Sequence, residues 1–357
     1  MIISRTPFRI SFFGGGTDYP EWYRVHGGQV LATTIDKYAY LMCRYLPPFF
    51  EHRHSITYSK IEHCHRIDEI SHPAVRAVLQ HLGFERGIQV NYHGDLPARS
   101  GMGSSSTFTV GLLHALYALK GAIVSKAQLA KEGILVEQQI LRETVGSQDQ
   151  VLAAFGGLNH IVFQPSNEVT VRPMTIRAER VRELESHLML FYTAVKRTAS
   201  AVAATYVPTI RSKDAELKRT GAMVEEAMAV LAGEADMRAF GELLHEAWEI
   251  KRGLSPAVSN PQIEEFYATA RAAGAIGGKL LGAGGGGFML LFVPPGRQDA
   301  VRHALGRFIH VPFKFEFSGS QIIFFDPEPE YVTEEEFRAN GAIEAFRELL
   351  ETRGSEA

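Results

Sequence analysis

The sequence contains very few cysteines, and it has no long apolar run. Cys43 and Cys64 are the only cysteines among 357 residues, which argues against a disulfide framework and fits a reducing compartment. The longest apolar runs, such as residues 288–293, are far shorter than the roughly 20 residues that a membrane-spanning helix needs. The first residues also lack a charged segment followed by an apolar core, so we expect no signal peptide. These absences predict a cytoplasmic protein with no membrane partner.

A strong excess of charge of either sign is also absent. The 37 basic and 40 acidic residues leave a formal charge of −3, so nothing points to nucleic acid as a partner, and any anion site must be built locally. Hydrophobic residues make up 45% of the chain and charged residues 22%, the balance of an ordinary globular protein with a sizeable core. The length allows two domains.

Apolar periodicity and turn residues predict a first part rich in strands and a second part rich in helices. In the first part we expect strands at residues 2–4, 10–13, 29–34, 38–45, 87–93, 158–163 and 169–173. We expect helices there at residues 73–82, 103–119 and 126–143, the last with Ser125 as N-cap. In the second part we expect helices at residues 214–231, 237–252 and 262–273, and strands at residues 188–193, 288–293, 313–317 and 321–325. We therefore place a domain boundary near residue 178, which gives domains 1–178 and 179–357.

An arginine and an aspartate flank a glycine turn near the start of the chain. Residues 7–19 read Pro-Phe-Arg-Ile-Ser-Phe-Phe-Gly-Gly-Gly-Thr-Asp-Tyr. Arg9 lies among apolar residues of a strand, and a guanidinium there needs a carboxylate or phosphate partner. Asp18, just after the turn, can accept hydrogen bonds from substrate hydroxyls.

Residues 97–106 have the pattern of a loop that binds phosphate. Gly101 and Gly103 let the backbone approach an anion, and the start of the following helix presents unpaired N–H groups. The serines add donors, and one of them can bind a hard cation through oxygen. This is not a Walker A loop, because no Lys-Ser or Lys-Thr follows the glycines. A polar turn with Ser104 or Ser105 as an ordinary N-cap stays an alternative.

A second glycine-rich stretch, residues 282–287, contains a G-x-G-x-x-G pattern. The dinucleotide-binding fingerprint requires a strand before these glycines and a helix after them. Here we expect a helical segment and residues 279–281 before them and a strand after them, so that interpretation fails. Four consecutive glycines before a buried strand instead predict close packing against a second loop or a ligand, and packing without any ligand contact stays an alternative.

Two acidic residues are candidates for the chemistry. Asp149 lies where a helix is expected to begin after Gly146, and its alternative is an ordinary first-turn acid stabilised by the helix dipole. If Arg9 reaches Asp149, it would hold the carboxylate ionised and oriented. Glu137, on the preceding helix, can offer oxygen to Mg²⁺, although a surface helix acid is equally compatible with the sequence.

Two other groups of residues are less informative. Lys196 and Arg197 follow the strand at 188–193 and are candidates to grip an anion, although a solvated charge pair explains them as well. A set of histidines surrounds Cys64 in an expected loop region, but its spacing fits no standard zinc pattern. These histidines are His52, His54, His63, His65 and His72.

Together these segments resemble the GHMP kinase superfamily, which includes galactokinases, homoserine kinases and mevalonate kinases. Residues 7–19 match the first motif of its sugar kinases, residues 97–105 match its P-x-x-x-G-L-G-S-S phosphate loop, and residues 279–288 match its C-terminal glycine motif. The resemblance covers nearly the whole chain. It implies an α+β fold with an N-terminal domain of ribosomal-protein-S5-like topology, a ferredoxin-like C-terminal domain, and a site in the cleft.

The resemblance also implies ATP and Mg²⁺ as cofactors and assigns roles to individual residues. Asp149 and Arg9 would be catalytic, and Ser105 and Glu137 would hold Mg²⁺. The nucleotide would be bound by Pro97, Ser100, Gly101, Met102, Gly103, Ser104, Ser105 and Ser106. The sugar would be bound by Gly14, Gly15, Gly16, Thr17, Asp18, Arg197, Gly284 and Gly285.

One departure from the galactokinases bears on the substrate. Gly15 and Gly16 stand where galactokinases carry Glu-His, which argues against galactose. The triple glycine, Trp22, residues 137–138 and residues 148–150 look more like heptose 7-phosphate kinases, with the kinase domain of L-fucokinase as a near relative. This implies phosphorylation of the anomeric C1 hydroxyl of D-glycero-D-manno-heptose 7-phosphate, with a basic residue on the 7-phosphate. Candidates for that residue are Arg24, Lys196 and Arg197.

Two other activities stay open at this point. One is a fucokinase-type reaction on an unphosphorylated sugar, and the other is a non-catalytic sensor of sugar and ATP on the same fold. The sequence also leaves a homodimer open.

Overall fold

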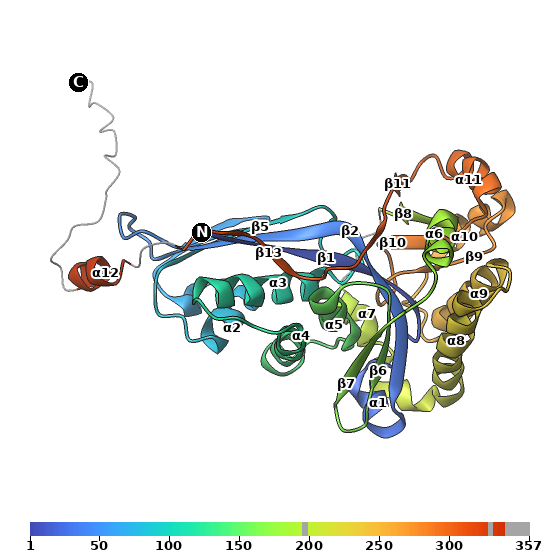
Figure 1. Cartoon of the computed structure of the whole chain (residues 1–357), viewed down its shortest axis with the longest axis horizontal. Helices are drawn as coiled ribbons and strands as arrows, with labels where there is room; N and C mark the ends of the chain where they lie inside the picture. Colours follow the sequence, from blue (N-terminus) through green and yellow to red (C-terminus); the bar gives the residue numbers. More distant parts are fainter. Residues whose placement is uncertain (195–198, 328–330, 340–357) are drawn as a thin grey trace, which may run out of the picture.

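The computed structural model describes residues 1–194, 199–327 and 331–339. Lys196 and Arg197, which we expected near the substrate, lie outside the described residues. Two β-sheets, each flanked by helices, form the molecule (Figure 1). Within the described residues, no helix is both long enough and apolar enough to span a membrane.

The larger sheet is built around two long antiparallel strands, β1 (Ile2–Phe13) and β2 (Gly28–Tyr45). The sequence predicts each as two shorter strands, but the pairing continues through both gaps. The register between them shifts at Pro7/Arg9, beside a proline that cannot donate to the ladder, and again at Ser11/Phe13. In the described chain this sheet has nine strands, which also include β3 (His54–Thr57), β4 (Ile61–Cys64), β5 (Ile88–Gly94), β6 (Asn159–Phe163), β7 (Val169–Pro173), β12 (Phe315–Glu316) and β13 (Gln321–Phe325).

The histidine-rich region is a strand hairpin and not the expected loop. β3 pairs with β4 and also runs parallel to β5, because Ile56 and His54 are buried against the sheet. The rings of His52 and His63 stack at 3.9 Å. Among the described residues, no group of three or more His, Cys, Asp or Glu side chains is arranged to hold a metal ion.

Helices cover one face of the larger sheet (Figure 1). The predicted N-cap is confirmed, because the Ser125 hydroxyl accepts from the amide of Gln128. The helix that we expected to reach residue 143 instead changes to a π-helical turn, η2 (Leu135–Ile140), and ends there. The helices of this part are α1 (Pro20–His26), α2 (Pro73–His81), α3 (Ser104–Leu119), α4 (Lys126–Ile134) and α5 (Gln148–Phe155), with a 3-10 turn η1 (Ile67–Glu69).

The smaller sheet has the strand order β11 (Ile309–Val311), β8 (Leu188–Tyr192), β10 (Phe288–Phe292) and β9 (Gly277–Leu280). We did not predict β9, since the expected helix ends at residue 273 and no strand was expected between that residue and residue 288. Two glycines explain the strand, since a Cβ on Gly277 would lie 1.9 Å from the carbonyl oxygen of Gly241 on the neighbouring helix. The helices are α6 (Ala178–His187), α7 (Ala199–Ala203), α8 (Asp214–Ala232), α9 (Arg238–Gly253), α10 (Pro261–Ala273), α11 (Gln298–Ala304) and α12 (Val332–Ala339), with 3-10 turns η3 (Val207–Ser212) and η4 (Pro295–Arg297).

The two halves of the chain are not separate along the sequence. β12 and β13 come after the smaller sheet but pair with β2 and β1 of the larger sheet. The expected strand at 313–317 is reduced to the two residues of β12. The boundary near residue 178 stays a prediction.

Alternation along β1 positions the site. Phe8, Ile10 and Phe12 are fully buried in a core shared with α8, α9 and β10. Because successive side chains point to opposite faces, Arg9 and Ser11 point the other way and line a cavity. β1 is therefore covered by apolar packing on one face and carries polar side chains on the other.

Candidate active site

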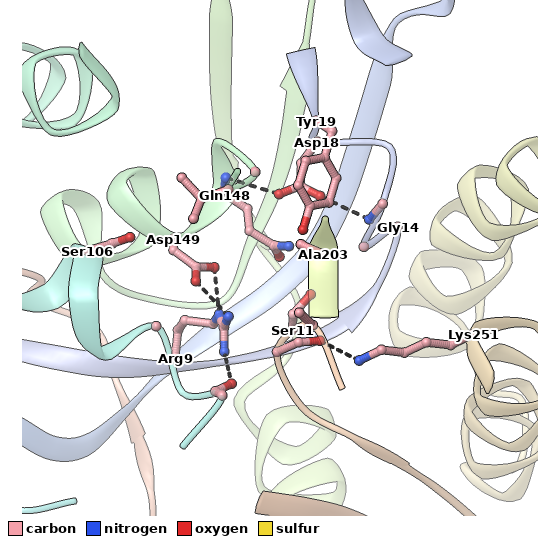
Figure 2. A pocket seen from close by; sticks show the side chains of 18 of the residues that line it. Arg9, Ser11, Gly14, Asp18, Tyr19, Ser106, Gln148, Asp149, Ala203 and Lys251 are labelled. Atoms are coloured by element: carbon pink, nitrogen blue, oxygen red, sulfur yellow. Dashed lines mark hydrogen bonds and ion pairs between the residues drawn. The ribbon is translucent and has the colours of Figure 1, made fainter. Parts of the chain in front are cut away.

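A cavity of about 260 Å³ lies where segments distant in the chain meet. Its walls come from β1, the glycine turn that follows it, the start of α3, the start of α5, α9 and the loop after β9. Figure 2 shows Arg9, Asp149, Asp18 and Lys251 around this space. All four segments that the sequence singled out contribute to one cavity.

Arg9 and Asp149 form a bidentate ion pair at the centre of the site. The Nε and Nη2 atoms of Arg9 each donate to a carboxylate oxygen of Asp149 at 2.7 Å. Arg9 is 4% exposed, and its Nη1 donates to the carbonyl oxygen of Gly101 at 2.6 Å. The predicted contact is confirmed. Two parallel charge-assisted hydrogen bonds fix the plane of the carboxylate as well as its position.

The loop before α3 leaves amide groups free at the cavity. Gly103 is the N-cap of α3, in a left-handed conformation with φ of 76°, and no side chain caps the helix. The Ser104 hydroxyl instead accepts from the amide of Arg99, so the alternative of a serine N-cap is wrong. Unpaired amides at a helix start attract an anion.

Not every residue that we expected at the nucleotide faces the cavity. The lining residues from this loop are Gly101, Gly103, Ser104, Ser105 and Ser106, together with Arg99. Met102 is buried in the core, and the carbonyl oxygen of Ser100 accepts from the amide of Phe288. Pro97 is exposed and outside the lining.

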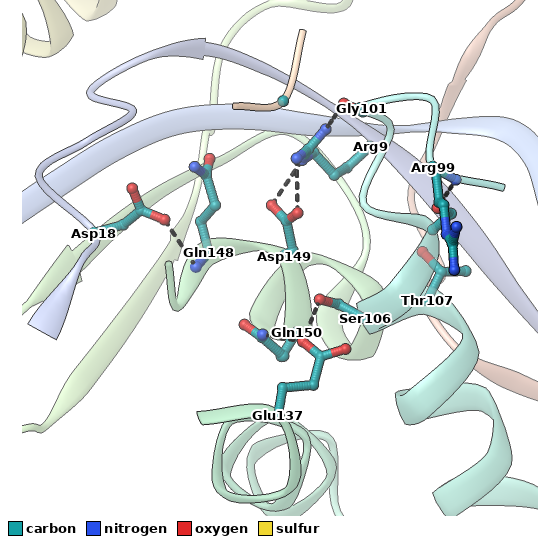
Figure 3. A network of polar contacts seen from close by, with 12 residues as sticks. Arg9, Asp18, Arg99, Gly101, Ser106, Thr107, Glu137, Gln148, Asp149 and Gln150 are labelled. Atoms are coloured by element: carbon teal, nitrogen blue, oxygen red, sulfur yellow. Dashed lines mark hydrogen bonds and ion pairs between the residues drawn. The ribbon is translucent and has the colours of Figure 1, made fainter. Parts of the chain in front are cut away.

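Glu137 is fully buried behind the serines and is not a surface acid. Its carboxylate accepts from Ser106 Oγ at 2.6 Å and from the side-chain amide of Gln150, both labelled in Figure 3. It also accepts from Thr109 Oγ1 at 3.1 Å. Burial raises the pKa of Glu137 to about 7, although these hydrogen bonds oppose the shift. Ser105 and Ser106 line the cavity, whereas Glu137 does not.

The glycine turn after β1 holds a second buried carboxylate. Asp18 is 1% exposed and accepts from the amides of Gly16 at 3.0 Å and Gln148 at 3.3 Å. Burial raises the pKa of Asp18, and the nearby Asp149 carboxylate raises it further. A side chain at position 146 would displace the Asp18 carboxylate, because a Cβ there would lie 1.9 Å from Asp18 Oδ2.

The other predicted sugar-binding residues divide into two groups. Gly14, Gly15 and Gly16 line the cavity with Asp18. Thr17 does not, because its hydroxyl bonds to the carbonyl oxygens of Gly14 and Gln29.

Two lysines that the sequence analysis did not name individually also line the cavity. Lys279 Nζ donates to the carbonyl oxygen of Phe12 at 2.9 Å, and burial, followed by the charge of Arg9, lowers its pKa to about 8. Lys251 Nζ donates to the carbonyl oxygens of Leu280 at 2.7 Å and of Gly282. Burial lowers its pKa well below the usual value, and Lys279 and Arg9 add to this effect. Lys279 was visible as part of a motif, but nothing in the sequence around Lys251 distinguishes it from other helix lysines.

Most of the glycines at 282–287 pack against other parts of the chain and do not line the cavity. A Cβ on Gly282 would lie 2.5 Å from Gly101 Cα, so the two glycine loops touch backbone to backbone. Gly284 packs against Val258, and the amide of Gly285 donates to the carbonyl oxygen of Val258 at 2.8 Å. Both lie outside the lining residues, which from this stretch include Gly282 and Ala283.

Of the three residues that we expected on a 7-phosphate, Arg24 is described, and it does not line the cavity. Arg24 donates to Asn167 Oδ1 at 2.7 Å and lines a second cavity with Lys131 and Gln138. Lys196 and Arg197 fall outside the described residues.

Two family models match this chain. The model for the N-terminal domain of GHMP kinases matches residues 69–157, and the model for their C-terminal domain matches residues 227–310.

Among curated proteins, a D-glycero-alpha-D-manno-heptose 7-phosphate kinase of Campylobacter jejuni is 28% identical over 317 residues, which cover 85% of this chain and 93% of that protein. A mevalonate kinase of Pyrococcus abyssi is 29% identical over 238 residues, 65% of this chain and 67% of that protein. The bifunctional fucokinase/GDP-fucose pyrophosphorylase of Arabidopsis thaliana is 24% identical over 80% of this chain and 29% of its own length.

Solved structures share the fold. A D-glycero-D-manno-heptose 1-phosphate kinase from Bacteriodes thetaiotaomicron superposes with a TM-score of 0.74 at 24% identity, over 91% of this chain and 100% of that one. Galactokinase of Lactococcus lactis, complexed with galactose, has a TM-score of 0.68 at 18% identity over 90% of this chain and 94% of that one. The expected α+β fold is therefore confirmed.

Proposed function

This chain belongs to the GHMP kinase family, a family of ATP-dependent phosphotransferases, and we propose that it phosphorylates the C1 hydroxyl of D-glycero-D-manno-heptose 7-phosphate. The product would be the 1,7-bisphosphate, and the reaction would belong to nucleotide-activated heptose biosynthesis. The name of the Campylobacter relative, which this chain matches over 93% of its length, supports the substrate. The observation that carries the proposed chemistry is the Arg9–Asp149 pair beside the uncapped start of α3, within one cavity.

The residues at the start of α3 fit the triphosphate of ATP. The free amides of the first turn and the cavity-lining hydroxyls of Ser104, Ser105 and Ser106 are donors to phosphate oxygens. Ser105 and Glu137 would hold Mg²⁺, a hard cation that prefers oxygen ligands. When bound, this ion would neutralise charge that develops on the transferred phosphoryl group.

In the proposed reaction, Asp149 would act on the acceptor hydroxyl. Its carboxylate borders the same cavity as the serines, and Arg9 fixes its plane. Asp149 would accept the proton of the C1 hydroxyl or orient that hydroxyl toward the γ-phosphorus, while Arg9 counters the negative charge. Asp18 would select the sugar through its hydroxyls. Phosphoryl transfer depends mainly on positioning and electrostatics, so these few groups suffice.

The substrate is tested by measuring ADP release with ATP and Mg²⁺ against a panel of acceptors. The panel contains the heptose 7-phosphate, the same heptose without phosphate, L-fucose, galactose and mevalonate. We expect the highest kcat/KM with the heptose 7-phosphate and a new phosphate at C1 by ³¹P NMR. A preference for L-fucose would support the fucokinase-type activity instead. ATP binding without ADP release from any acceptor would support the non-catalytic sensor.

The role of Asp149 is tested with Asp149→Asn. Loss of the carboxylate should lower kcat by about 10²–10⁴-fold while ATP binding is retained, because the general base is lost but the phosphate loop is intact. The matched control is Asp68→Asn, an exposed carboxylate paired with Arg66 away from the cavity, which should keep its turnover. Turnover near that of the unmodified protein in Asp149→Asn would refute the assignment.

A further inference from the structure

One wall of the cavity carries two buried polar side chains with an atom that lacks a hydrogen-bond partner. They are Ser11, through its Oγ, and Gln148, through its Oε1. Ser11 is 6% exposed and Gln148 is 9% exposed, and both line the cavity (Figure 2). Buried polar atoms in folded proteins are almost always hydrogen-bonded, so two unpartnered atoms on one wall point to a bound ligand as the missing partner.

Gly15 lies beside both of these side chains. A Cβ on Gly15 would be 3.8 Å from Ser11 Oγ and 3.9 Å from Gln148 Nε2, with no other atom within 4 Å. The flanking Gly14 and Gly16 have φ of 83° and 103°, a conformation that favours glycine, whereas Gly15 does not. The backbone therefore does not require glycine at position 15. What the missing side chain provides is space between two polar groups.

The unpartnered atoms indicate which chemical group belongs in this space. Charges of both signs lie close by, because the backbone amide of Gln148 donates to Asp18, Asp149 is the next residue, and Lys279 donates to the carbonyl oxygen of Phe12 next to Ser11. Gln148 Oε1 needs a donor, which an ionised phosphate or carboxylate does not have. A hydroxyl both donates and accepts, so it can bond to the Ser11 hydroxyl and to the side-chain amide of Gln148. This holds whichever of the two side-chain atoms, Oε1 or Nε2, faces the hydroxyl.

We propose that Ser11, Gly15 and Gln148 form a subsite that binds the acceptor hydroxyl adjacent to the one that is phosphorylated. This assignment rests on the proposed function, in which the phosphorylated hydroxyl is at C1 and its neighbour is at C2. Gln148 and Asp149 are consecutive residues in the first turn of α5. The group that binds the neighbouring hydroxyl is therefore fixed relative to the carboxylate that acts on the reacting hydroxyl.

The subsite is tested with Ser11→Ala and Gln148→Met, each assayed with the acceptor and with its analogue that lacks the neighbouring hydroxyl. Without substitution, the protein should favour the complete acceptor over the deoxy analogue by about 100-fold in kcat/KM or more, since a site built for a hydroxyl is left unpaired by the analogue. Each variant should lose about tenfold on the complete acceptor, mainly through KM, and little on the analogue. The preference for the complete acceptor should therefore fall from about 100-fold to about tenfold in each variant.

A serine from the same strand provides the matched control. Ser4 is also buried on β1, but its hydroxyl donates to the carbonyl oxygen of Gly111 at 2.8 Å and it does not line the cavity. Ser4→Ala should keep the full discrimination even if it lowers the melting temperature. A merely structural role for Ser11 would make the two alanine variants behave alike.

Gly15→Ala tests the space itself. The added methyl group meets atoms only at ordinary contact distances, so the melting temperature should not change. The KM for the acceptor should rise about tenfold while the KM for ATP stays constant, because the methyl group occupies the place of the hydroxyl. The control is Gly296→Ala, which has no neighbouring atom within 4 Å and lies outside the cavity, so both KM values should be unchanged.

Two results would overturn the subsite. One is unchanged discrimination in both Ser11→Ala and Gln148→Met, and the other is an unchanged acceptor KM in Gly15→Ala. Failure of the proposed substrate is a separate outcome, because the acceptor panel detects it without any substitution. If another sugar is preferred, the same variants are compared on that sugar and on its deoxy analogue.

Discussion

The two glycine-rich loops of this protein look alike in sequence and differ in what their glycines do. In residues 97–106, Gly101 and Gly103 border the cavity with three serines. In residues 282–287, the lining residues are Gly282 and Ala283, and Gly284 and Gly287 pack against other backbone. A Cβ on Gly287, for example, would lie 2.1 Å from the carbonyl oxygen of Ser100 in the other loop. The second loop therefore supports the first.

The secondary structure after each loop explains the difference. The first loop runs into α3, whose first amides have no partner within the helix. The second runs into β10, which pairs on both sides with β8 and β9. A strand inside a sheet has no free donors for an anion, whereas a helix start does. The element after a glycine-rich loop is therefore a better guide to phosphate binding than the number of glycines.

The largest expected effect is the loss of stability in Gly287→Ala. The residue has φ of 102°, and the new Cβ would meet the Ser100 carbonyl oxygen at 2.1 Å, so backbone must move. We expect unfolding to become easier by about 3 kcal/mol or more, seen as a lower melting temperature. Gly83→Ala is the control, with φ of 61° and no atom within 4 Å, and it should show backbone strain alone. Equal melting temperatures for the two variants would contradict a packing role for the second loop.

Gly103→Ala should instead reduce activity. Its Cβ would lie 3.2 Å from Arg9 Cγ and 3.3 Å from Asp149 Oδ2, so the ion pair must shift. We expect kcat to fall about 100-fold, because small displacements of reacting groups are costly, together with a stability loss of about 1–2 kcal/mol from its positive φ. The control is Gly121→Ala, just after the other end of α3. Gly121 has φ of 70° and no atom within 4 Å, so this variant should have the same backbone strain as Gly103→Ala and an unchanged kcat. A similar fall in kcat in both variants would show that helix strain, and not the ion pair, is responsible.

Much of this arrangement could be predicted from local sequence. An anionic partner for Arg9 followed from its place among apolar residues, and the structure shows that Asp149 is a partner, which was only a hypothesis from the sequence. The uncapped helix start at the cavity followed from glycines and serines before a helix, and phosphate binding there stays a prediction. In both cases the physical requirement lies in a few neighbouring residues, so the pattern shows it.

The features that were missed depend on contacts between distant segments. Lys251 looks like any lysine on an amphipathic helix, and it reaches the cavity only because α9 packs beside β9. Glu137 was a candidate from the sequence, but its full burial was not predictable, because the donors that surround it come from α3 and α5. Gly284 and Gly285 were expected at the substrate, but the chain folds them onto Val258. The periodicity of one segment carries no information about these neighbours.

The lysine before the second loop should make nucleotide binding weaken at alkaline pH. Burial lowers the pKa of Lys279 to about 8, so it is cationic below that pH and loses its charge as the pH rises. The protonated fraction falls about eightfold from pH 7.5 to pH 9, and the KM for ATP should rise by about that factor if this charge attracts the phosphates. Asp18, Arg9 and Lys251 also act on this group. Lys279→Met should have the high KM at both pH values, and a flat profile in the unmodified protein would refute the effect.

The carboxylate behind the first loop should limit activity on the acid side, by a smaller amount. Burial raises the pKa of Glu137 to about 7, so its ionised form is lost as the pH falls through neutrality. Protons and Mg²⁺ would then compete for it, and the apparent KM for Mg²⁺ should rise about threefold from pH 7.5 to pH 6.5. ATP itself titrates nearby, so Glu137→Gln is the control and should show only the dependence that the nucleotide contributes. Identical profiles for the two proteins would mean that Glu137 holds Ser106 in place without binding the metal. Metal binding by the first loop would then depend on its serines alone, which the second loop lacks.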